Sequence, residues 1–183
     1  MRIHGLILAS LLGALAGCES SVPGVGNFDT VDSGVLRRGA APTPAGVAQL
    51  RDRGIRTIVD LQNTDDADER AAAVKLGIKY VQIPMRPWPF EPDDAKMIRF
   101  LSIVLCPENR PVFVHCQFGK DRTGAAVAVY RRVIDGWSAD SAVVDLHTHE
   151  GLDALFFPDI PKYIRRLDVQ SMRQAAERAR CSE

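Results

Sequence analysis

From Val35 onward, segments with the pattern of β-strands alternate with segments of helical periodicity. The strand segments are short and rich in β-branched residues, whereas the helical segments repeat apolar residues every three or four positions. Strands are expected at 35–38, 56–61, 79–83 and 111–115. Helices are expected at 43–53, 65–76, 93–105, 122–134, 139–149 and 158–180.

This alternation predicts an α/β fold in which residues 35–183 form a single domain. We expect a mainly parallel sheet of about four to five strands, flanked by helices on both faces. Ligands of such sheets bind beyond the carboxyl ends of the strands. Residues 115–124, at a strand-to-helix junction, are therefore the predicted functional site.

The N-terminus has the pattern of a targeting segment. Gly5 to Ala16 is apolar apart from Ser10, too short to span a bilayer but long enough for a signal peptide. The run ends in Leu-Ala-Gly-Cys18, which resembles the bacterial lipobox, in which the cysteine becomes the lipidated first residue. We therefore assign residues 1–17 to a lipoprotein signal peptide and residues 18–34 to a lipidated Cys18 and a tether.

The lipobox resemblance implies a location in the bacterial cell envelope, anchored by lipid and facing the periplasm. Glu19 follows the cysteine where an Asp would favour inner-membrane retention, so the outer membrane is favoured. Elsewhere, 23 basic and 23 acidic residues give a net charge of zero, so no bulk electrostatic argument points to nucleic acid. We expect a monomer.

The chain contains four cysteines, and their roles differ. Cys18 is assigned to lipid and Cys116 to chemistry. Cys106 and Cys181 could pair in an oxidising periplasm, or they could remain two thiols, and the sequence permits both. A disulfide between Cys106 and Cys116 is a third, less favoured arrangement.

The predicted site reads His-Cys-Gln-Phe-Gly-Lys-Asp-Arg-Thr-Gly over residues 115–124. Five residues separate Cys116 from Arg122, and a loop of that length can curl until its backbone N–H groups converge on one phosphate. Gly119 permits a turn that a side chain would block. The following helix N-terminus favours an anion and hence the Cys116 thiolate. Arg122 can hold two phosphate oxygens with its planar fork.

The other loop residues have supporting roles in this interpretation. The Thr123 hydroxyl is placed to donate to the sulfur and so to assist both thiolate formation and departure of the thiolate. Lys120 either adds charge at the rim or is a solvated loop residue. The predicted phosphate-binding residues are Gln117, Phe118, Gly119, Lys120, Asp121 and Arg122.

The pattern His-Cys-x5-Arg-Thr-Gly resembles the signature loop of the protein tyrosine and dual-specificity phosphatases. The segment 36–42 is similar to the opening of the atypical dual-specificity phosphatases of bacteria, plants and fungi, in which a strand ends in Arg-Ser-x-x-Pro. Here Gly39 replaces the Ser. The resemblance covers about residues 35–136 and implies phosphomonoester hydrolysis through a phosphocysteine, without metal or cofactor.

Two substrate classes follow from the same resemblance. Lys120 and Asp121 before the Arg look like bacterial phosphatases that accept phosphotyrosine and phosphoinositides. The implied substrate is therefore a phosphorylated protein or, as the alternative, a phosphoinositide or inositol phosphate.

The proton donor for the leaving group is less clearly marked. Residues 88–94 read Trp-Pro-Phe-Glu-Pro-Asp-Asp and resemble the Trp-Pro-Asp loop of tyrosine phosphatases, but Phe90 occupies the position of the Asp. Asp93 and Asp94 are the first candidates for the general acid, followed by Asp121, with Glu91 last. Each Asp also has a structural alternative, helix capping for Asp93 and Asp94 and loop shaping for Asp121.

Two other activities remain as alternatives. The displaced acid and the ease with which a thiolate oxidises are compatible with a non-catalytic, phosphate-binding lipoprotein. A rhodanese-like sulfurtransferase also uses a Cys at such a junction, but the Arg-Thr-Gly of residues 122–124 argues against it. His147, His149 and Glu150 are interpreted as surface or packing residues rather than as a metal site.

Overall fold

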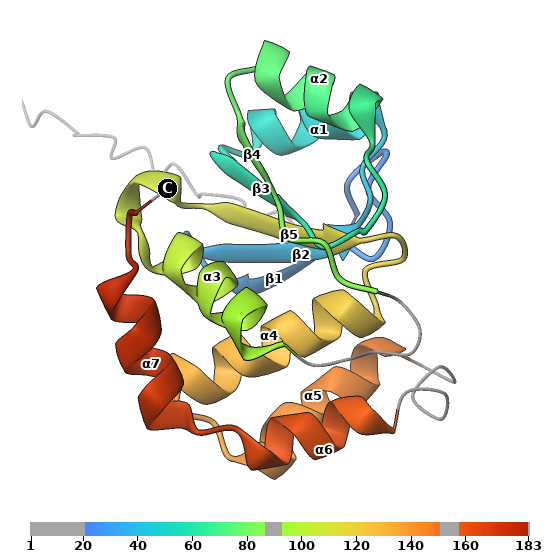
Figure 1. Cartoon of the computed structure of the whole chain (residues 1–183). Helices are drawn as coiled ribbons and strands as arrows, with labels where there is room; N and C mark the ends of the chain where they lie inside the picture. Colours follow the sequence, from blue (N-terminus) through green and yellow to red (C-terminus); the bar gives the residue numbers. More distant parts are fainter. Residues whose placement is uncertain (1–20, 87–92, 151–157, 183) are drawn as a thin grey trace, which may run out of the picture.

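A five-stranded sheet forms the centre of the computed structural model, which describes residues 21–86, 93–150 and 158–182 (Figure 1). The strand order is β1-β2-β5-β3-β4. Strand β1 runs antiparallel to β2 at the edge, and all other neighbours are parallel. The strands are β1 (Asp29–Asp32), β2 (Leu36–Ala40), β3 (Thr57–Asp60), β4 (Lys79–Gln82) and β5 (Val112–Cys116).

Helices cover both faces of the sheet, as the sequence predicts (Figure 1). One face carries α1 (Pro44–Asp52) and α2 (Ala67–Lys75). The other face carries α3 (Asp94–Leu105), α4 (Asp121–Val133), α5 (Ala139–Glu150), α6 (Asp159–Arg166) and α7 (Val169–Arg178). A short 3-10 helix, Pro107–Asn109, leads into β5. Two hydrophobic cores result, one between the sheet and each helical layer.

The side chains of β5 alternate between these two cores. Phe113 belongs to the smaller core on the α1 and α2 side, whereas Val112, Val114 and Cys116 belong to the larger core beneath α3 and α4. His115 stacks on Phe113, with ring centroids 5.6 Å apart. The period of two along a strand therefore sends His115 and Cys116 to opposite faces.

The domain begins earlier than the sequence analysis predicts. Val22 and Val25 are buried in the same core as Val47, and Asp29–Asp32 form the edge strand β1. The assignment of the whole of 18–34 to a tether was therefore wrong from residue 22 onward. Isolated valines among Gly and Pro show no periodicity, so only tertiary contacts reveal that they belong to the core.

The prediction of one helix over 158–180 was also wrong. Helix α6 ends at Arg166, and α7 begins anew at Val169. Asp168 caps α7 by accepting a hydrogen bond of 3.0 Å from the backbone N–H of Ser171. Leu167 leaves the helical conformation, with φ −55° and ψ 129°. The sequence contains a signal for this break, because an Asp within a helical pattern is a common N-cap.

Cys106 and Cys181 form a disulfide, and Cys116 is a free thiol. The bridge joins the end of α3 to the segment that follows α7, on the side of the sheet where β5 begins. Of the arrangements that the sequence left open, this is the one present. The catalytic candidate Cys116 lies at the other end of β5.

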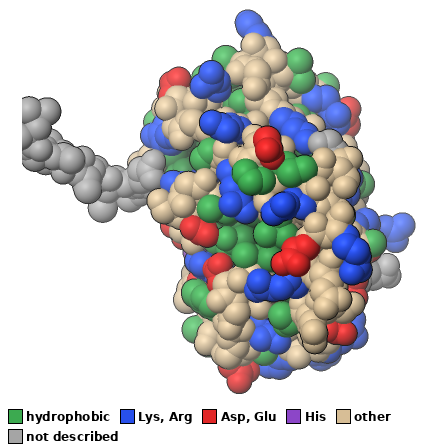
Figure 2. Space-filling view, turned by 90° about the vertical axis from the view of Figure 1, so that its left-hand side faces the viewer, with side chains coloured by type: hydrophobic (Ala, Val, Ile, Leu, Met, Phe, Trp, Pro, Cys, Tyr) green, Lys and Arg blue, Asp and Glu red, His purple; other side chains and the backbone are tan. Residues whose placement is uncertain are grey.

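Figure 2 shows the side on which β5 begins and α4 ends, where Lys and Arg side chains gather around apolar ones. Two arginines at these helix ends have structural partners. Arg110 donates to the carbonyl oxygens of Val104 and Leu105 at the end of α3, and Arg173 donates to those of Val133 and Ile134 at the end of α4. Cations at helix C-termini satisfy carbonyl groups that lack intrahelical donors.

None of the helices in the described part of the chain is long and apolar enough to span a membrane.

Candidate active site

The predicted loop connects the carboxyl end of the central strand β5 to the N-terminus of α4. Cys116, the last residue of β5, is buried, and Arg122 is the second residue of α4. Gly119, at the turn of the loop, has a φ of +71°, a conformation that side-chain-bearing residues rarely adopt. The loop therefore lies where the sequence predicts, at the edge where parallel strands end.

The carbonyl groups of the loop are held by donors from outside the loop. The backbone N–H of Ala41 donates to the Gln117 oxygen at 3.4 Å. The Asn27 side chain donates to the Phe118 oxygen, and the Arg38 guanidinium to the Gly119 oxygen, each at 2.8 Å. These contacts fix the orientation of three successive peptide groups.

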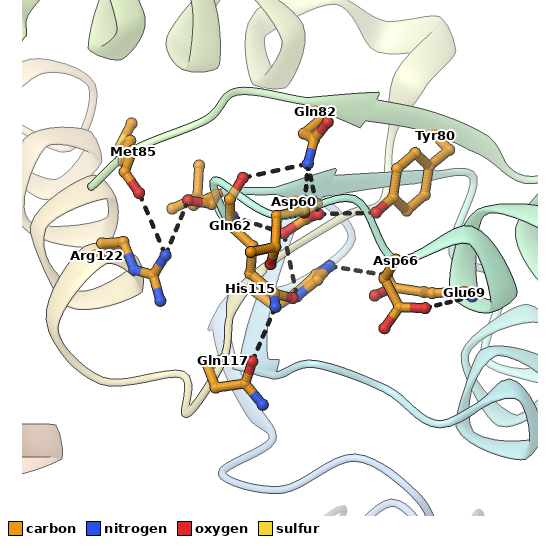
Figure 3. Close-up of polar contacts among 12 residues, drawn as sticks. Asp60, Gln62, Asp66, Glu69, Tyr80, Gln82, Met85, His115, Gln117 and Arg122 are labelled. Carbon is orange, nitrogen blue, oxygen red and sulfur yellow. Dashed lines mark hydrogen bonds and ion pairs between the residues drawn. The ribbon is translucent and has the colours of Figure 1, made fainter. Parts of the chain in front are cut away.

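Arg122 is held from the neighbouring strands. Its Nη1 donates to the carbonyl oxygens of Leu61 at 3.4 Å and Met85 at 3.3 Å, just beyond the ends of β3 and β4 (Figure 3). The guanidinium is almost fully buried. Its position is thus set by the sheet edge, and a planar guanidinium held at one edge can offer the other to phosphate oxygens.

A buried polar cluster lies behind the loop, on the α2 side of the sheet (Figure 3). His115 Nε2 is 2.9 Å from the Glu69 carboxylate, and His115 Nδ1 is 3.9 Å from Asp60 Oδ1. Asp60 also accepts hydrogen bonds from the Gln62 N–H at 2.7 Å and the Tyr80 O–H at 2.8 Å. His115 thus contacts β3 and α2 rather than the phosphate-binding side of the loop. These contacts fix the end of β5 that carries Cys116.

Burial shifts the acidity of this cluster. It raises the pKa of Glu69 above its usual value, and the hydrogen bond with His115 opposes that shift only in part. Burial, reinforced by the charges of Glu69 and Asp60, raises the pKa of Tyr80, so the phenol remains a hydrogen-bond donor. Sequence reasoning missed Glu69 and Asp60. The available signal was His115 itself, because a polar residue inside a doubly buried strand requires a polar partner.

The remaining loop residues vary in exposure. Gln117 accepts a hydrogen bond of 3.0 Å from Gln62, which ties the start of the loop to the end of β3. The Phe118 side chain points to solvent, 65% exposed. Thr123 is fully buried, and within the described residues its hydroxyl oxygen makes no hydrogen bond. Asp121 is the first residue of α4, and its Oδ1 is buried. The expected roles of Thr123 and Asp121 stay predictions.

The first candidates for the general acid, Asp93 and Asp94, occupy structural positions. Asp93 caps α3 by accepting the Lys96 N–H at 3.2 Å. Asp94 accepts a hydrogen bond of 2.7 Å from the Tyr163 O–H, and burial, together with this bond, raises the pKa of Tyr163. Both carboxylates line a cavity of about 830 Å³ with Arg86, the residue after Met85. The cavity therefore adjoins the segment that holds Arg122. Glu91, Phe90 and Cys18 lie outside the described residues.

His149, from the His-x-His-Glu run, contacts the edge strand. Its Nε2 is 3.0 Å from Asp29 Oδ2, which joins α5 to β1. This histidine therefore has a packing partner in the sheet, whereas His147 is exposed, and the run was interpreted as surface or packing residues.

A family model described as "DSP-PTPase phosphatase fused to NAD+ Kinase" matches residues 23–154, from the region of β1 to α5. The chain belongs to this family. The match includes the Cys116 loop and the buried cluster behind it, and it is the family that the Cys-x5-Arg resemblance indicates.

Curated relatives carry phosphatase names. The dual-specificity protein phosphatase TpbA of Pseudomonas aeruginosa is 29% identical over 193 residues, covering 97% of this chain and 86% of that protein. The inositol diphosphatase DSP3 of Arabidopsis thaliana is 28% identical over 156 residues, covering 81% of this chain and 73% of that protein.

Solved structures have the same fold. The crystal structure of TpbA from P. aeruginosa in complex with pTyr has a TM-score of 0.68 and 28% identity, covering 82% of this chain and 95% of that one. The catalytic domain of the PP-IP phosphatase SIW14 from Saccharomyces cerevisiae has a TM-score of 0.77 and 24% identity, covering 86% and 95%. The chain is therefore an α/β phosphatase of the dual-specificity type.

Proposed function

We propose that this chain hydrolyses phosphomonoesters through a phosphocysteine formed on Cys116. The observation that carries the proposal is the free, buried Cys116 at the end of the central strand, followed by a loop whose carbonyls point to Ala41, Asn27 and Arg38. Such a loop offers its N–H groups to an oxyanion, and Arg122 adds a fixed cation.

The reaction runs in two steps. The Cys116 thiolate attacks phosphorus in line, the S–P bond forms, and the P–O bond to the leaving group breaks. The loop N–H groups and Arg122 stabilise the equatorial oxygens, and one of Asp93, Asp94 and Asp121 protonates the leaving oxygen. Water then attacks the phosphocysteine and gives a proton to the carboxylate that acted as the acid, so that the S–P bond breaks, phosphate is released and both the thiolate and the acid are regenerated, with the Thr123 hydroxyl assisting the departure of sulfur.

Phosphorylated proteins are the first substrate class of the proposal, and inositol phosphates or phosphoinositides are the second. The name of TpbA and its pTyr complex support the first class. The names of DSP3 and SIW14, an inositol diphosphatase and a PP-IP phosphatase, support the second. Rates on a phosphotyrosine peptide, soluble inositol phosphates and micellar phosphoinositides, measured side by side, distinguish the two classes.

We also propose that Cys18 is lipidated and holds the site beside a membrane on the periplasmic side, with the outer membrane favoured. Ser21 lines a cavity of about 580 Å³ together with Gly119 of the loop. Cys18 precedes Ser21 by three residues, a reach of at most about 11 Å of extended chain. A lipid attached at Cys18 would thus be tethered within that distance of Ser21, at the cavity that Asn27 and Gly119 also line. The disulfide between Cys106 and Cys181 is of the kind that persists in oxidising compartments.

The anchor is tested by metabolic labelling with a fatty acid and by fractionation of the envelope. Wild type should carry label and sediment with outer membranes, whereas Cys18→Ser should carry none and appear in the soluble fraction. A soluble, unlabelled wild-type protein would exclude the anchor without affecting the phosphatase proposal.

The hydrolysis proposal is tested with a chromogenic aryl phosphate and the full chain in detergent micelles with reductant. Cys116→Ser should abolish turnover. A folded wild type that binds orthovanadate without turning over the ester would instead support the alternative of a non-catalytic phosphate-binding lipoprotein.

A further inference from the structure

Two side chains outside the signature loop are bonded to its backbone. Asn27 precedes β1, and its Nδ2 donates to the Phe118 oxygen across 91 residues of sequence. Arg38 lies on β2, next to Val114 of β5 in parallel register, and its Nη2 donates to the Gly119 oxygen. The Arg38 side chain is 1% exposed, so its guanidinium is inside the protein directly behind the loop.

The direction of each peptide group follows from these bonds. In a trans peptide the carbonyl of one residue and the N–H of the next point in opposite directions. Because Asn27 and Arg38 hold the carbonyls of Phe118 and Gly119, the N–H groups of Gly119 and Lys120 point away from both donors. Those two N–H groups belong to the set that a phosphate between Cys116 and Arg122 would require.

The bond from Arg38 also acts through the peptide group. A guanidinium is always charged, and its hydrogen bond to a carbonyl polarises the attached amide. The N–H of Lys120 thereby becomes a stronger donor, and the positive charge of Arg38 would lie one peptide group behind an anion bound to that N–H. Asn27 provides orientation for the preceding peptide without adding charge.

We propose that Arg38 and Asn27 are positioning residues of this phosphatase, which orient the loop amides toward the bound phosphoryl group. The inference rests on the proposed phosphate-binding function of the loop. Each side chain is bonded to the carbonyl side of a loop peptide, opposite its N–H group, so removing either one should weaken binding of orthovanadate more than it weakens the fold.

The test compares orthovanadate affinity and steady-state hydrolysis in the full chain. Asn27→Asp keeps shape and tolerates the φ of 49° at this position but replaces the donor with an acceptor facing the Phe118 carbonyl. Arg38→Gln removes the charge, and Arg38→Lys keeps it without the planar fork. Arg37→Gln is the matched control, because the neighbouring arginine bonds to the Asp32 carbonyl instead.

The expected loss in orthovanadate affinity is about tenfold or more for Arg38→Gln, which removes one hydrogen bond from a charged group. A loss of about tenfold is also expected for Asn27→Asp, because the new carboxylate both lacks the neutral hydrogen bond and repels the Phe118 carbonyl. Arg38→Lys should recover part of the Arg38→Gln loss. For both positions kcat should fall while KM changes little, because the amides bind the transition state more strongly than the ester. Arg37→Gln should match wild type.

Folded variants that bind orthovanadate and turn over as wild type does would overturn the inference. If the Arg38 variants do not fold, the Asn27 variants alone test the inference, because the Asn27 side chain lies at the exposed rim and its loss should not prevent folding. Asn27→Gly keeps the backbone conformation and removes only the amide, so it should show a smaller loss than Asn27→Asp. A wild type that neither binds orthovanadate nor hydrolyses the ester would refute the phosphatase proposal itself, a result distinguishable from unchanged variants in an active enzyme.

Discussion

Gly119 at the turn of the phosphate loop lies directly on the backbone of Gly39 at the end of β2. A Cβ built on Gly119 would lie 2.4 Å from the Gly39 carbonyl carbon and 2.5 Å from its oxygen. Backbone atoms cannot move aside as a flexible side chain can. The end of β2 therefore serves as the template against which the loop is shaped.

Gly119→Ala should therefore displace the loop and inactivate the enzyme. A loop shift of the order of 1 Å is expected to lower kcat/KM about 100-fold, because the amides no longer align on the phosphoryl group. The measurement is aryl phosphate hydrolysis alongside thermal unfolding. Gly34→Ala is the control, since Gly34 also has a positive φ, of +74°, but its Cβ would meet nothing within 4 Å. Equal activity in the two variants would contradict the template interpretation.

Gly39 is a departure from the family pattern that its packing explains. The atypical dual-specificity phosphatases carry Ser at this position. Here a Cβ would lie 2.9 Å from two ring carbons of Phe113 and 3.0 Å from Val25. The large ring on β5 thus occupies the space that a serine side chain would need.

The elements and the nucleophile loop were predictable because local signals agreed. Thr43 with Pro44, for example, marks the start of α1, and the apolar run 112–114 marks a central strand. The Cys116 and Arg122 pair is likewise a local pattern of spacing. These predictions depend only on residues close together in the sequence, and over such short distances periodicity and capping residues indicate the structure.

The parts that escaped sequence reasoning depend on distant contacts. Asn27 and Arg38 reach the loop from 91 and 81 residues away, and nothing at those positions marks them as loop contacts. Glu69 occupies the first turn of α2, where an acid is expected for the helix dipole alone. Its burial against His115 follows from the packing of α2 on the sheet, which periodicity does not specify.

Because Glu69 is buried, we expect the stability of the fold to depend on pH. Burial raises the pKa of its carboxyl, so between the ordinary Glu value of about 4.3 and the raised value the folded state binds more protons than the unfolded state. The stabilising contribution of this group is complete below that ordinary value and is lost as pH rises through the folded-state pKa. The free energy of unfolding should therefore fall with rising pH in this window.

Glu69→Gln cannot titrate, so its free energy of unfolding should depend less steeply on pH than that of wild type. Urea unfolding at a series of pH values measures both slopes. Asp68→Asn, an exposed residue of the same helical turn, is the control and should follow wild type. Parallel curves for Glu69→Gln and wild type would show that burial of Glu69 has no effect on its proton binding.

We expect removal of the disulfide to lower stability without changing catalysis. Cys106 and Cys181 are 75 residues apart, and the chain-entropy model assigns a bridge of that span about 4 kcal/mol. Cys181→Ser should lower the melting temperature on the order of 10 °C. Because the bridge lies at the end of β5 opposite Cys116, kcat well below the melting temperature should not change. Reductant should reproduce the shift in wild type and have no effect on the variant; an equal response of both proteins would contradict the assignment.

The general acid can be identified without disturbing the helices that carry the candidates. Asn caps a helix about as well as Asp, so Asp93→Asn should preserve the start of α3 while removing the proton donor. In Asp94→Asn the amide oxygen can still accept the Tyr163 O–H. Asp121→Asn completes the set at the start of α4.

We expect Asp93→Asn or Asp94→Asn to lower kcat for an alkyl phosphate about 100-fold or more and to affect an activated aryl phosphate far less. A poor leaving group needs the proton, whereas a nitrophenolate departs without it. Melting curves and orthovanadate affinity, which do not depend on the acid, should stay at wild-type values in the same variants. If only Asp121→Asn shows the leaving-group dependence, the acid lies inside the loop, and the carboxylates of Asp93 and Asp94 serve α3 and Tyr163 alone.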